Sequence, residues 1–243
     1  MKYESLYKYS TDNRCCYGKS RLSFRGPQKL LTDNYVTFIG GTQTFGKGAT
    51  FPFPEIVENR IGKMCLNLGV ANASIDAFIN DQGVLDITCN GDLTVLEIMG
   101  PQNLSNRFYR VRPRRNDRFL QESTVLKALY PEVDFTEFDF TGHLLKTLSE
   151  LSKERFEIVI SELQEVWLER MKLLLATVDR KTILLWIHDA TIQQYVSTDM
   201  IDEIRDSVHE IIEFEAATYG MHWLGGEHHR VIGEKLALSI QAI

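Results

Sequence analysis

The sequence lacks a long uninterrupted run of apolar residues. No apolar run approaches the roughly 20 residues that a membrane-spanning helix requires. The N-terminal stretch, MKYESLYKYS, also lacks the continuous apolar core of a signal peptide. We therefore expect no membrane span and a cytoplasmic location. The chain has 243 residues, 44% hydrophobic and 25% charged, which is ordinary for a folded globular protein.

Positive charge is also in short supply. Asp and Glu number 33 against 27 Lys and Arg, which gives a net charge of -6. A protein that binds nucleic acid without regard to sequence needs a basic surface to neutralise phosphates. This class of function is therefore excluded for the chain as a whole, although a local basic patch is compatible with the composition.

Signatures of metal and redox sites are missing. The cysteines, which show neither zinc-ligand spacing nor a CxxC motif, are Cys15, Cys16, Cys65 and Cys89. Four of the six histidines, which show no HxH or HExxH spacing, are His143, His188, His209 and His222. We expect reduced thiols, no metal and no cofactor. The sequence does not indicate an oligomeric state.

The chain has no internal repeat and no linker that would divide it, so we expect one domain over residues 1–243. Short apolar segments that end in glycine or polar residues alternate with helical patterns, which is typical of a parallel sheet. The five expected strands are residues 35–41, 63–70, 93–100, 181–189 and 210–217. This order predicts a three-layer α/β/α fold with a five-stranded parallel sheet, flavodoxin-like in topology.

Helical spacing is clearest in four places. Pro54 is expected in the first turn of a helix after the first strand, and residues 141–178 are expected to be helical, with Ser152 capping a restart. A further helix is expected near residues 198–209, and the last helix near His229. Residues 101–140 break the rhythm, and we interpret them as an excursion from the domain, because so long an irregular segment is usually functional or inserted.

Parallel sheets place ligand sites at the carboxyl ends of their strands. Polar residues that follow the expected strands are therefore the candidates for a functional site. They are Thr42, Gln43, Thr44, Asn67, Asn72, Gln102, Asn103, Asn106, Glu227, His228 and His229.

The chain order of these residues resembles the SGNH or GDSL hydrolase superfamily. In GGTQTFG, Gly40, Thr44 and Gly46 match the GDSxTxG motif that carries the nucleophilic serine. Gly41 stands where the motif has aspartate, and Thr42 stands where it has serine. The resemblance implies that Thr42 occupies the position of the nucleophile.

The resemblance continues with departures in the later blocks. Asn72 in NLGVANAS stands where the superfamily has the oxyanion-hole glycine. In MGPQNL, Gln102 stands at the offset of the oxyanion asparagine, with Asn103 one residue later and Asn106 nearby. These residues are the expected oxyanion and polar pocket.

The late DxxH block is represented by GGEHHRVIG. Its spacing to Gly233 selects His228 as the catalytic counterpart, and His229 fits if the loop is shifted by one residue. The aspartate position is occupied by Gly225, so Glu227 or Asp189 is the expected third member.

Together these residues predict an acyl-transfer mechanism. Thr42 would attack, His228 or His229 would take its proton, and backbone and amide N–H groups would stabilise the oxyanion. The alternatives are that Thr42 and Thr44 only hydrogen-bond the following turn, and that the histidines are solvated surface residues. Threonine adds a methyl group that crowds the attacking oxygen, which favours the alternative.

An arginine-rich stretch, NRFYRVRPRRNDRF, stands out from the acidic chain. Its arginines are Arg107, Arg110, Arg112, Arg114, Arg115 and Arg118. Guanidinium groups bind phosphate, sulfate and carboxylate in a bidentate manner, so this stretch is a candidate for gripping an anionic or sugar-like substrate. The structural alternative is that these arginines pair with nearby acids, and the expected partners are Asp117, Glu122, Glu132 and Asp134.

A closer resemblance is to an uncharacterised bacterial domain-of-unknown-function family. It extends over nearly the whole chain and includes YGKSRLSFRGP, YVTFIGGTQTFG, NLGVANASIDAFIND, MGPQNLSNRFYRVRPRRNDRFL and LYPEVDFTEFDFT. This resemblance implies no activity. Three hypotheses follow: an SGNH-like ester hydrolase or O-acyltransferase for a small polar, carbohydrate or anionic substrate, a catalytically degenerate module that binds a ligand or partner through the arginines, and a transferase of an anionic group.

Overall fold

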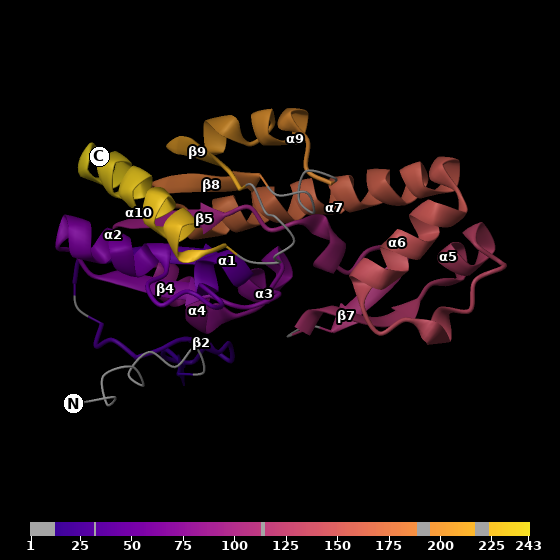
Figure 1. Ribbon diagram of the computed structural model, residues 1–243, viewed down its shortest axis with the longest axis horizontal. Helices are drawn as coiled ribbons and strands as arrows, with labels where there is room; N and C mark the ends of the chain where they lie inside the picture. Colours follow the sequence, from indigo (N-terminus) through magenta and orange to yellow (C-terminus); the bar gives the residue numbers. More distant parts are fainter. Residues whose placement is uncertain (1–12, 32, 113–114, 189–194, 217–223) are drawn as a thin grey trace.

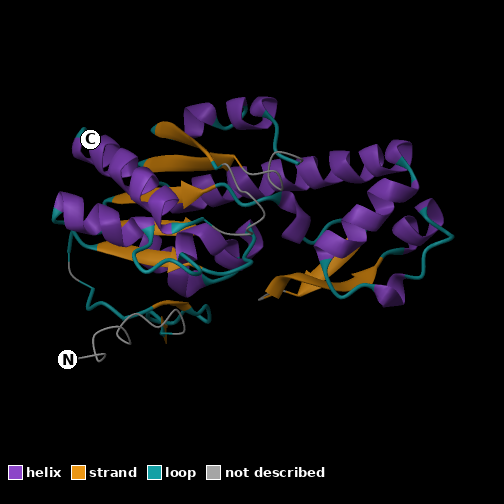
Figure 2. Ribbon diagram, viewed as in Figure 1, coloured by secondary structure: helices purple, strands orange, loops and turns teal. Residues whose placement is uncertain are grey.

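A parallel five-stranded sheet forms the middle layer of the larger part of the molecule, at the left in Figures 1 and 2. The computed structural model describes residues 13–31, 33–112, 115–188, 195–216 and 224–243. The strands are β3 (Val36–Gly40), β4 (Cys65–Gly69), β5 (Leu93–Glu97), β8 (Thr182–His188) and β9 (Glu210–Glu215). They pair in parallel in the order β4-β3-β5-β8-β9. The five-stranded parallel sheet expected from the sequence is therefore confirmed.

Helices cover both faces of this sheet, which gives the expected three layers. The first face carries α2 (Phe53–Ile61) and α10 (Gly226–Gln241), and the second carries α3 (Ile75–Ile79), α4 (Gln82–Cys89) and α7 (Lys153–Val178). In β3, Val36 and Phe38 belong to the hydrophobic cluster of the first face and Ile39 to that of the second. The strand is buried throughout because its side chains alternate between two covered faces.

The excursion predicted at about 101–140 builds a lobe beside the sheet (Figure 1). It contains the 3₁₀ turns Pro101–Asn103 and Phe135–Glu137, the strands β6 (Tyr109–Arg112) and β7 (Arg115–Glu122), and the helix α5 (Thr124–Leu129). The helix α6 (Thr141–Leu151) and the first half of α7 complete a third hydrophobic cluster, with Phe108, Tyr130 and Leu163 among its members. We call this unit the lobe. Strands β6 and β7 form an antiparallel hairpin.

The long helix α7 joins the two parts. Its first half packs in the lobe, and its second half lies on the sheet, where Trp167 is fully buried and donates its Nε1 hydrogen to the carbonyl of Met99 at 2.6 Å. Ser152 separates α6 from α7 and accepts the backbone N–H of Arg155, so the predicted restart at this serine is confirmed.

The remaining elements are short. They are β1 (Arg14–Cys15), β2 (Phe24–Arg25), α1 (Thr42–Phe45), α9 (Thr198–Asp202) and the 3₁₀ turn Arg205–Ser207. The helix expected over residues 198–209 is thus a shorter helix followed by that turn, and the last helix begins at Gly226 instead of near His229. The division of residues 1–243 into domains remains a prediction.

Two properties expected from the composition can be compared with the structure. The four cysteines are free thiols, and burial raises the pKa of Cys65 to about 12. Within the described ranges, no helix combines the length and the apolar character needed to cross a membrane.

The close approach of β4 to α1 predicts the effect of adding a single methyl group. A Cβ at Gly69 would lie 2.3 Å from the backbone nitrogen of Phe45, whereas a Cβ at Gly142 on α6 would meet no atom within 4 Å. We expect Gly69→Ala to lower the free energy of unfolding by about 1–3 kcal/mol. The matched change Gly142→Ala should raise it by up to about 1 kcal/mol, because alanine favours a helix. Urea denaturation of both variants measures the difference, and equal stabilities would contradict the packing described.

Candidate functional site

A tight turn lies at the carboxyl edge of the sheet, directly after β3. Strand β3 ends at Gly40, Gly41 precedes α1 directly, and Gly46 ends α1 with a left-handed φ of 72°. Gly40 must be glycine, because a Cβ there would lie 2.4 Å from the carboxylate of Glu97 and 2.2 Å from the hydroxyl of Thr44. This crowding places the first residue of α1, Thr42, at a fixed position beside the sheet edge.

A buried acid under this turn was missed by the sequence analysis. Glu97, the last residue of β5, is only 3% exposed. It accepts the backbone N–H groups of Gly41 at 3.0 Å and Thr44 at 2.8 Å, and also the Thr44 hydroxyl. Thr44 therefore holds the turn, as its structural alternative expected. The available signal was a charged residue within an otherwise apolar strand, LTVLE.

Thr42 and Asn72 are brought together, as the shared sheet edge predicted. The Thr42 hydroxyl accepts the backbone N–H of Asn72 at 3.0 Å and donates to Oδ1 of the same residue at 3.1 Å. Asn72 has a left-handed φ of 59°, a conformation typical of glycine that asparagine tolerates. Its side chain continues outward, and Nδ2 donates to Asp117 on β7 at 2.9 Å. The hairpin of the lobe thus reaches the residue next to Thr42.

His229 lies in the core between α10 and α2. Its ring is fully buried and stacks on Phe53, with centroids 5.6 Å apart, and Nδ1 accepts the backbone N–H of Phe53 at 3.2 Å. Nε2 therefore carries the proton, and it is buried without a hydrogen-bond partner in the described part of the chain. Burial, together with Arg25 and His228, lowers the pKa of His229 to about 4. The ring is neutral at pH 7.

The other residues of the late block lie nearer the surface. His228 is half-buried, its Nδ1 accepts the backbone N–H of Gly225 at 3.3 Å, and its ring lies edge-on to Phe214. Glu227 is exposed and forms an ion pair with Arg230 at 2.5 Å, and the hydrogen bond from Arg230 lowers the pKa of the acid. Asp189, the other candidate acid, lies outside the described residues.

The catalytic assignments of these residues remain predictions. Among the described residues, the hydrogen bonds of the Thr42 hydroxyl are to Asn72, and those of His228 and His229 are to backbone N–H groups. The two regions are nevertheless neighbours, because the Gln43 side chain accepts the backbone N–H of Leu224, just before α10, at 2.9 Å.

The expected oxyanion residues after β5 mainly support the lobe. Asn103 accepts the Thr141 hydroxyl at 2.8 Å, and Asn106 accepts the backbone N–H groups of Phe108 and Tyr109. Gln102 has a side-chain oxygen that is buried without a hydrogen-bond partner in the described residues. Their proposed role in an oxyanion hole is not demonstrated by these contacts.

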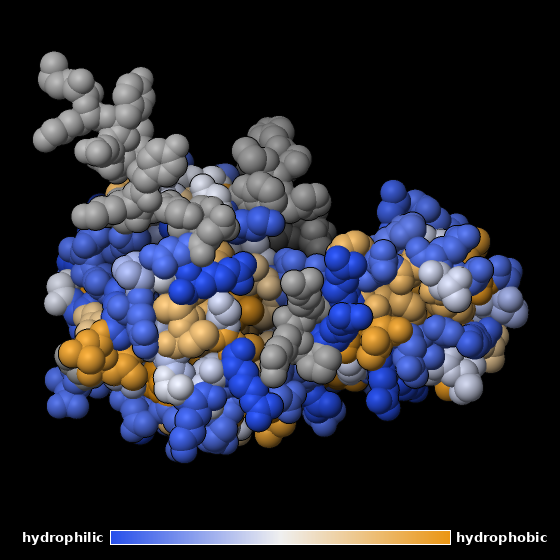
Figure 3. Space-filling model, turned by 90° about the horizontal axis from the view of Figure 1, so that it is seen from below, coloured by the Kyte–Doolittle hydropathy of each residue, from blue (hydrophilic) through white to orange (hydrophobic). Residues whose placement is uncertain are grey.

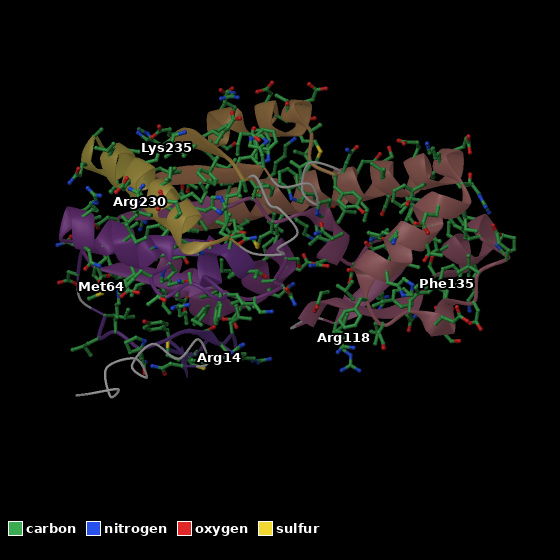
Figure 4. All side chains as sticks on the ribbon, in the orientation of Figure 1. Arg14, Met64, Arg118, Phe135, Arg230 and Lys235 are labelled. Carbon is green, nitrogen blue, oxygen red and sulfur yellow. The ribbon has the colours of Figure 1, made fainter. Side chains whose placement is uncertain are left out.

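The arginines divide into two groups. Arg107 pairs with Glu162 at 2.9 Å, and Arg118 lies over the Phe140 ring at 4.1 Å, with Asp139 at 3.9 Å. Figure 4 shows the Arg118 side chain extending outward from the lobe. Neither partner acid was among those expected from the sequence. Arg107 and Arg118 thus interact with acids other than those expected from their closeness in the sequence.

The second group lies along β6 and at the end of the hairpin. Arg110 and Arg112 are exposed on one face of β6, with the intervening Val111 buried, and Arg112 stands opposite Arg115 in the register. Of Arg115 only the backbone is described, and Arg114 lies outside the described residues.

The face of the molecule in Figure 3 is largely hydrophilic, with apolar residues in separate groups.

The side chains of Arg25 and Asn67 also hold this turn in place. The Arg25 guanidinium donates to the carbonyls of Gly46 at 2.7 Å and Ala49 at 2.8 Å, and Asn67 donates to the carbonyl of Thr44 at 2.8 Å. A cavity of about 230 Å³ lies on this side. Among the described residues, no cluster of three or more His, Cys, Asp or Glu side chains is arranged to hold a metal ion.

Residues 1–234 match the model of a family described as a domain of unknown function, DUF6473. The chain belongs to the DUF6473 family. The resemblance of the sequence to a domain-of-unknown-function family is thereby confirmed. No curated protein matches this DUF6473 chain.

Solved structures show the fold class. A protein from Desulfitobacterium hafniense DCB-2, assigned to the lipolytic G-D-S-L family, has a TM-score of 0.50 and 12% identity, over 84% of this chain and 98% of that chain. The lipase Lip_vut3 from a goat rumen metagenome has a TM-score of 0.45 and 12% identity, over 86% and 97%. The likeness to the first establishes an SGNH-like α/β fold for the DUF6473 chain, as predicted.

The buried His229 of the DUF6473 chain predicts a dependence of stability on pH. Its folded pKa, about 4, lies below the ordinary value of 6.5, so the unfolded chain binds the proton first as the pH falls. Stability should therefore fall between about pH 6.5 and pH 4, by about 3 kcal/mol in total at about 1.4 kcal/mol per unit.

His229→Asn provides the matched control, because its Oδ1 can accept the Phe53 N–H but does not titrate in this range. The variant should be less stable at pH 7 and lose less stability on acidification. Urea denaturation at a series of pH values measures both. An equal loss in parent and variant would show that His229 is not responsible.

Proposed function

We propose that this DUF6473 protein is an SGNH-like ester hydrolase or O-acyltransferase that acts on a small substrate bearing an anionic or polar group. The observation that carries the proposal is the pairing of Thr42 with Asn72. A hydroxyl at the carboxyl end of β3 lies 3.0 Å from a backbone N–H with a left-handed φ. A nucleophile beside an oxyanion donor is the arrangement that acyl transfer requires.

In the proposed reaction, Oγ1 of Thr42 forms a bond to the carbonyl carbon of the ester. The hydroxyl proton passes to an imidazole and then to the departing alkoxide, and water or a second alcohol later releases the acyl group by the reverse sequence. The backbone N–H of Asn72 would stabilise the oxyanion. No metal or cofactor is needed for these steps.

His228 is the better candidate for the base. A ring with a pKa of about 4, such as that of His229, is a weak base near neutral pH. His228 is half-buried at the start of α10, and Leu224, two residues before this helix, donates its backbone N–H to Gln43 of α1. The reaction requires the Gly225 N–H to release Nδ1 of His228, because the neutral ring otherwise carries its proton on Nε2. It also requires this end of α10 and Thr42 to approach each other when the substrate binds.

The lobe would supply substrate selectivity. Asp117 joins the hairpin to Asn72, and the same hairpin exposes Arg110 and Arg112. An anionic group held by these guanidinium groups would place the rest of a small substrate near Thr42. A small polar or anionic ligand and a cytoplasmic location remain parts of the proposal.

A second candidate function is a binding module without catalysis. The observation that favours it is the satisfied Thr42 hydroxyl, which already has both an acceptor and a donor partner in Asn72. Glu227 is also paired with Arg230, and no histidine of the described residues is hydrogen-bonded to it. Transfer of an anionic group, with the arginines as its binding site, is the third candidate.

Substitutions at Thr42 and His228 test the enzyme hypothesis. With p-nitrophenyl esters as substrates, Thr42→Ala should reduce kcat to the background rate, and His228→Ala should reduce it by about 100-fold or more, the usual contribution of a general base. Thr42→Ser should retain or increase the rate, because serine lacks the crowding methyl group.

Thr50→Ala provides a matched control, since Thr50 is exposed and follows α1 closely. It should hydrolyse the esters as the parent does, and circular dichroism should show the same fold in all variants. Equal rates in the parent, Thr42→Ala and His228→Ala would refute catalysis of these esters at this site and leave the binding module.

The arginine hairpin predicts a preference for negative charge. Two phenyl acetates that differ in one group provide the test, 4-acetoxybenzenesulfonate and the neutral 4-acetoxybenzenesulfonamide. Arg110→Ala combined with Arg112→Ala should raise KM for the sulfonate by about tenfold, as expected for loss of a charge-assisted hydrogen bond. KM for the sulfonamide should be nearly unchanged.

Arg118→Ala is the matched control, because Arg118 lies over Phe140 and pairs with Asp139. Its effects on the two substrates should be equal. If the Arg110 and Arg112 double variant also affects both substrates equally, the hairpin does not select for charge.

A further inference from the structure

A hydrogen-bonded chain connects the lobe to the proposed nucleophile. It runs from the Asp117 carboxylate to Nδ2 of Asn72 at 2.9 Å, and from Oδ1 of Asn72 to the Thr42 hydroxyl at 3.1 Å. The two bonds link three parts of the fold, which are β7 of the lobe, the loop after β4, and α1. The amide of Asn72 is the middle of the chain, and its orientation decides what Thr42 can do.

We propose that Asp117 is a positioning residue that fixes this amide orientation and so makes reaction at Thr42 depend on a negatively charged substrate. The inference rests on the proposed function for its catalytic consequence. The positioning itself follows from the geometry, because a carboxylate accepts hydrogen bonds and does not donate them. Asp117 therefore requires Nδ2 to face it, and Oδ1 must face Thr42.

This orientation holds Thr42 in a resting state. A hydroxyl has a single proton to donate, and Thr42 donates it to Oδ1 of Asn72. An amide oxygen is too weak a base to remove that proton. The backbone N–H of Asn72 also occupies an acceptor site of the hydroxyl at 3.0 Å. Thr42 is therefore held in place, and its proton points to the Asn72 amide oxygen and not to an imidazole that could remove it.

Rotation of the amide would reverse this arrangement. Nδ2 would then face the hydroxyl and act as a donor beside the backbone N–H of Asn72. Thr42 would have its proton free for His228, and the developing oxyanion would meet two donors from one residue. Asn72 is exposed, so the rotation requires no rearrangement of the core.

The charge of the substrate would control the rotation. Asp117 lies on the hairpin that exposes Arg110 and Arg112. An anionic group bound to these arginines would add negative charge to the hairpin that carries the Asp117 carboxylate. Like charges at short range disfavour each other. Asp117 then leaves Asn72, whereas a neutral substrate leaves the link intact.

Turnover of the sulfonate and sulfonamide esters defined above tests the inference. Asp117→Ala should raise kcat for the neutral ester about fivefold, which corresponds to loss of one ordinary hydrogen bond, with KM unchanged. The kcat for the sulfonate should stay at the parent level, so the preference for the anion decreases. Asp117→Glu keeps a carboxylate and should keep the preference.

Two kinetic outcomes would overturn the inference. If Asp117→Ala reduces kcat equally for both esters, Asp117 only supports the hairpin. If the ratio of the two kcat values is the same in the parent and Asp117→Ala, the amide orientation does not control selectivity.

A measurement that does not depend on activity separates this inference from the proposed function. In ¹⁵N-labelled protein, the Asn72 side-chain amide signals can be assigned by their loss in Asn72→Gly. The proton that donates to Asp117 should lie at low field in the parent and shift in Asp117→Ala. If Thr42→Ala hydrolyses the esters like the parent, the proposed function fails while this shift still reports positioning. Identical amide signals in the parent and Asp117→Ala would refute positioning whatever the kinetics.

Discussion

The arrangement of the site depends on one buried carboxylate. Glu97 is nearly inaccessible to water, and a buried charge is very unfavourable unless hydrogen bonds replace its hydration. Here the replacement comes from Gly41 and from the backbone and hydroxyl of Thr44. The chain can supply these donors only if it turns immediately after β3. The requirement to satisfy this buried side chain with hydrogen bonds therefore determines the path of the backbone that carries Thr42.

Other parts of the fold attach to the turn once it is fixed. Gln43 connects it to Leu224, which lies shortly before α10, Asn67 connects it to β4, and Arg25 holds the carbonyls that follow it. On the outer side, Thr42 meets Asn72, which in turn meets Asp117 of the lobe. Each contact joins segments far apart in the sequence, so the site is formed only when the sheet, its helices and the lobe are all folded together.

Most of the sheet could be predicted from the sequence because β3, β4, β5 and β8 are buried almost throughout, whereas β9 is partly exposed. Continuous apolar segments that end at glycine, as in β3, carry that signal locally. Ser152 was also predictable, since a helix cap depends on residues within one turn. The hairpin was not predicted, although β6 alternates buried and exposed residues, because the strand has only four residues and its register with β7 shifts within them.

The sequence predicted which residues lie at this edge of the sheet better than it predicted which residues they contact. The residues after the strands meet at one edge, as for Thr42 and Asn72, because parallel strands share a direction. Their partners could not be predicted, since Asn72 and Asp117 are separated by 45 positions and Arg107 and Glu162 by 55. Nothing local in the sequence distinguishes these acids from solvated ones.

The departures from the SGNH motif have a common physical effect. Asn72 retains the left-handed backbone expected of a glycine at its position, so its N–H still points at Thr42, and it adds an amide that binds the hydroxyl. The β-branched side chain of Thr42 has less rotational freedom than serine. Both changes restrict the hydroxyl, and the added amide connects it to the lobe through Asp117. These contacts are the physical basis of the proposed coupling between the Thr42 hydroxyl and the arginine-bearing hairpin.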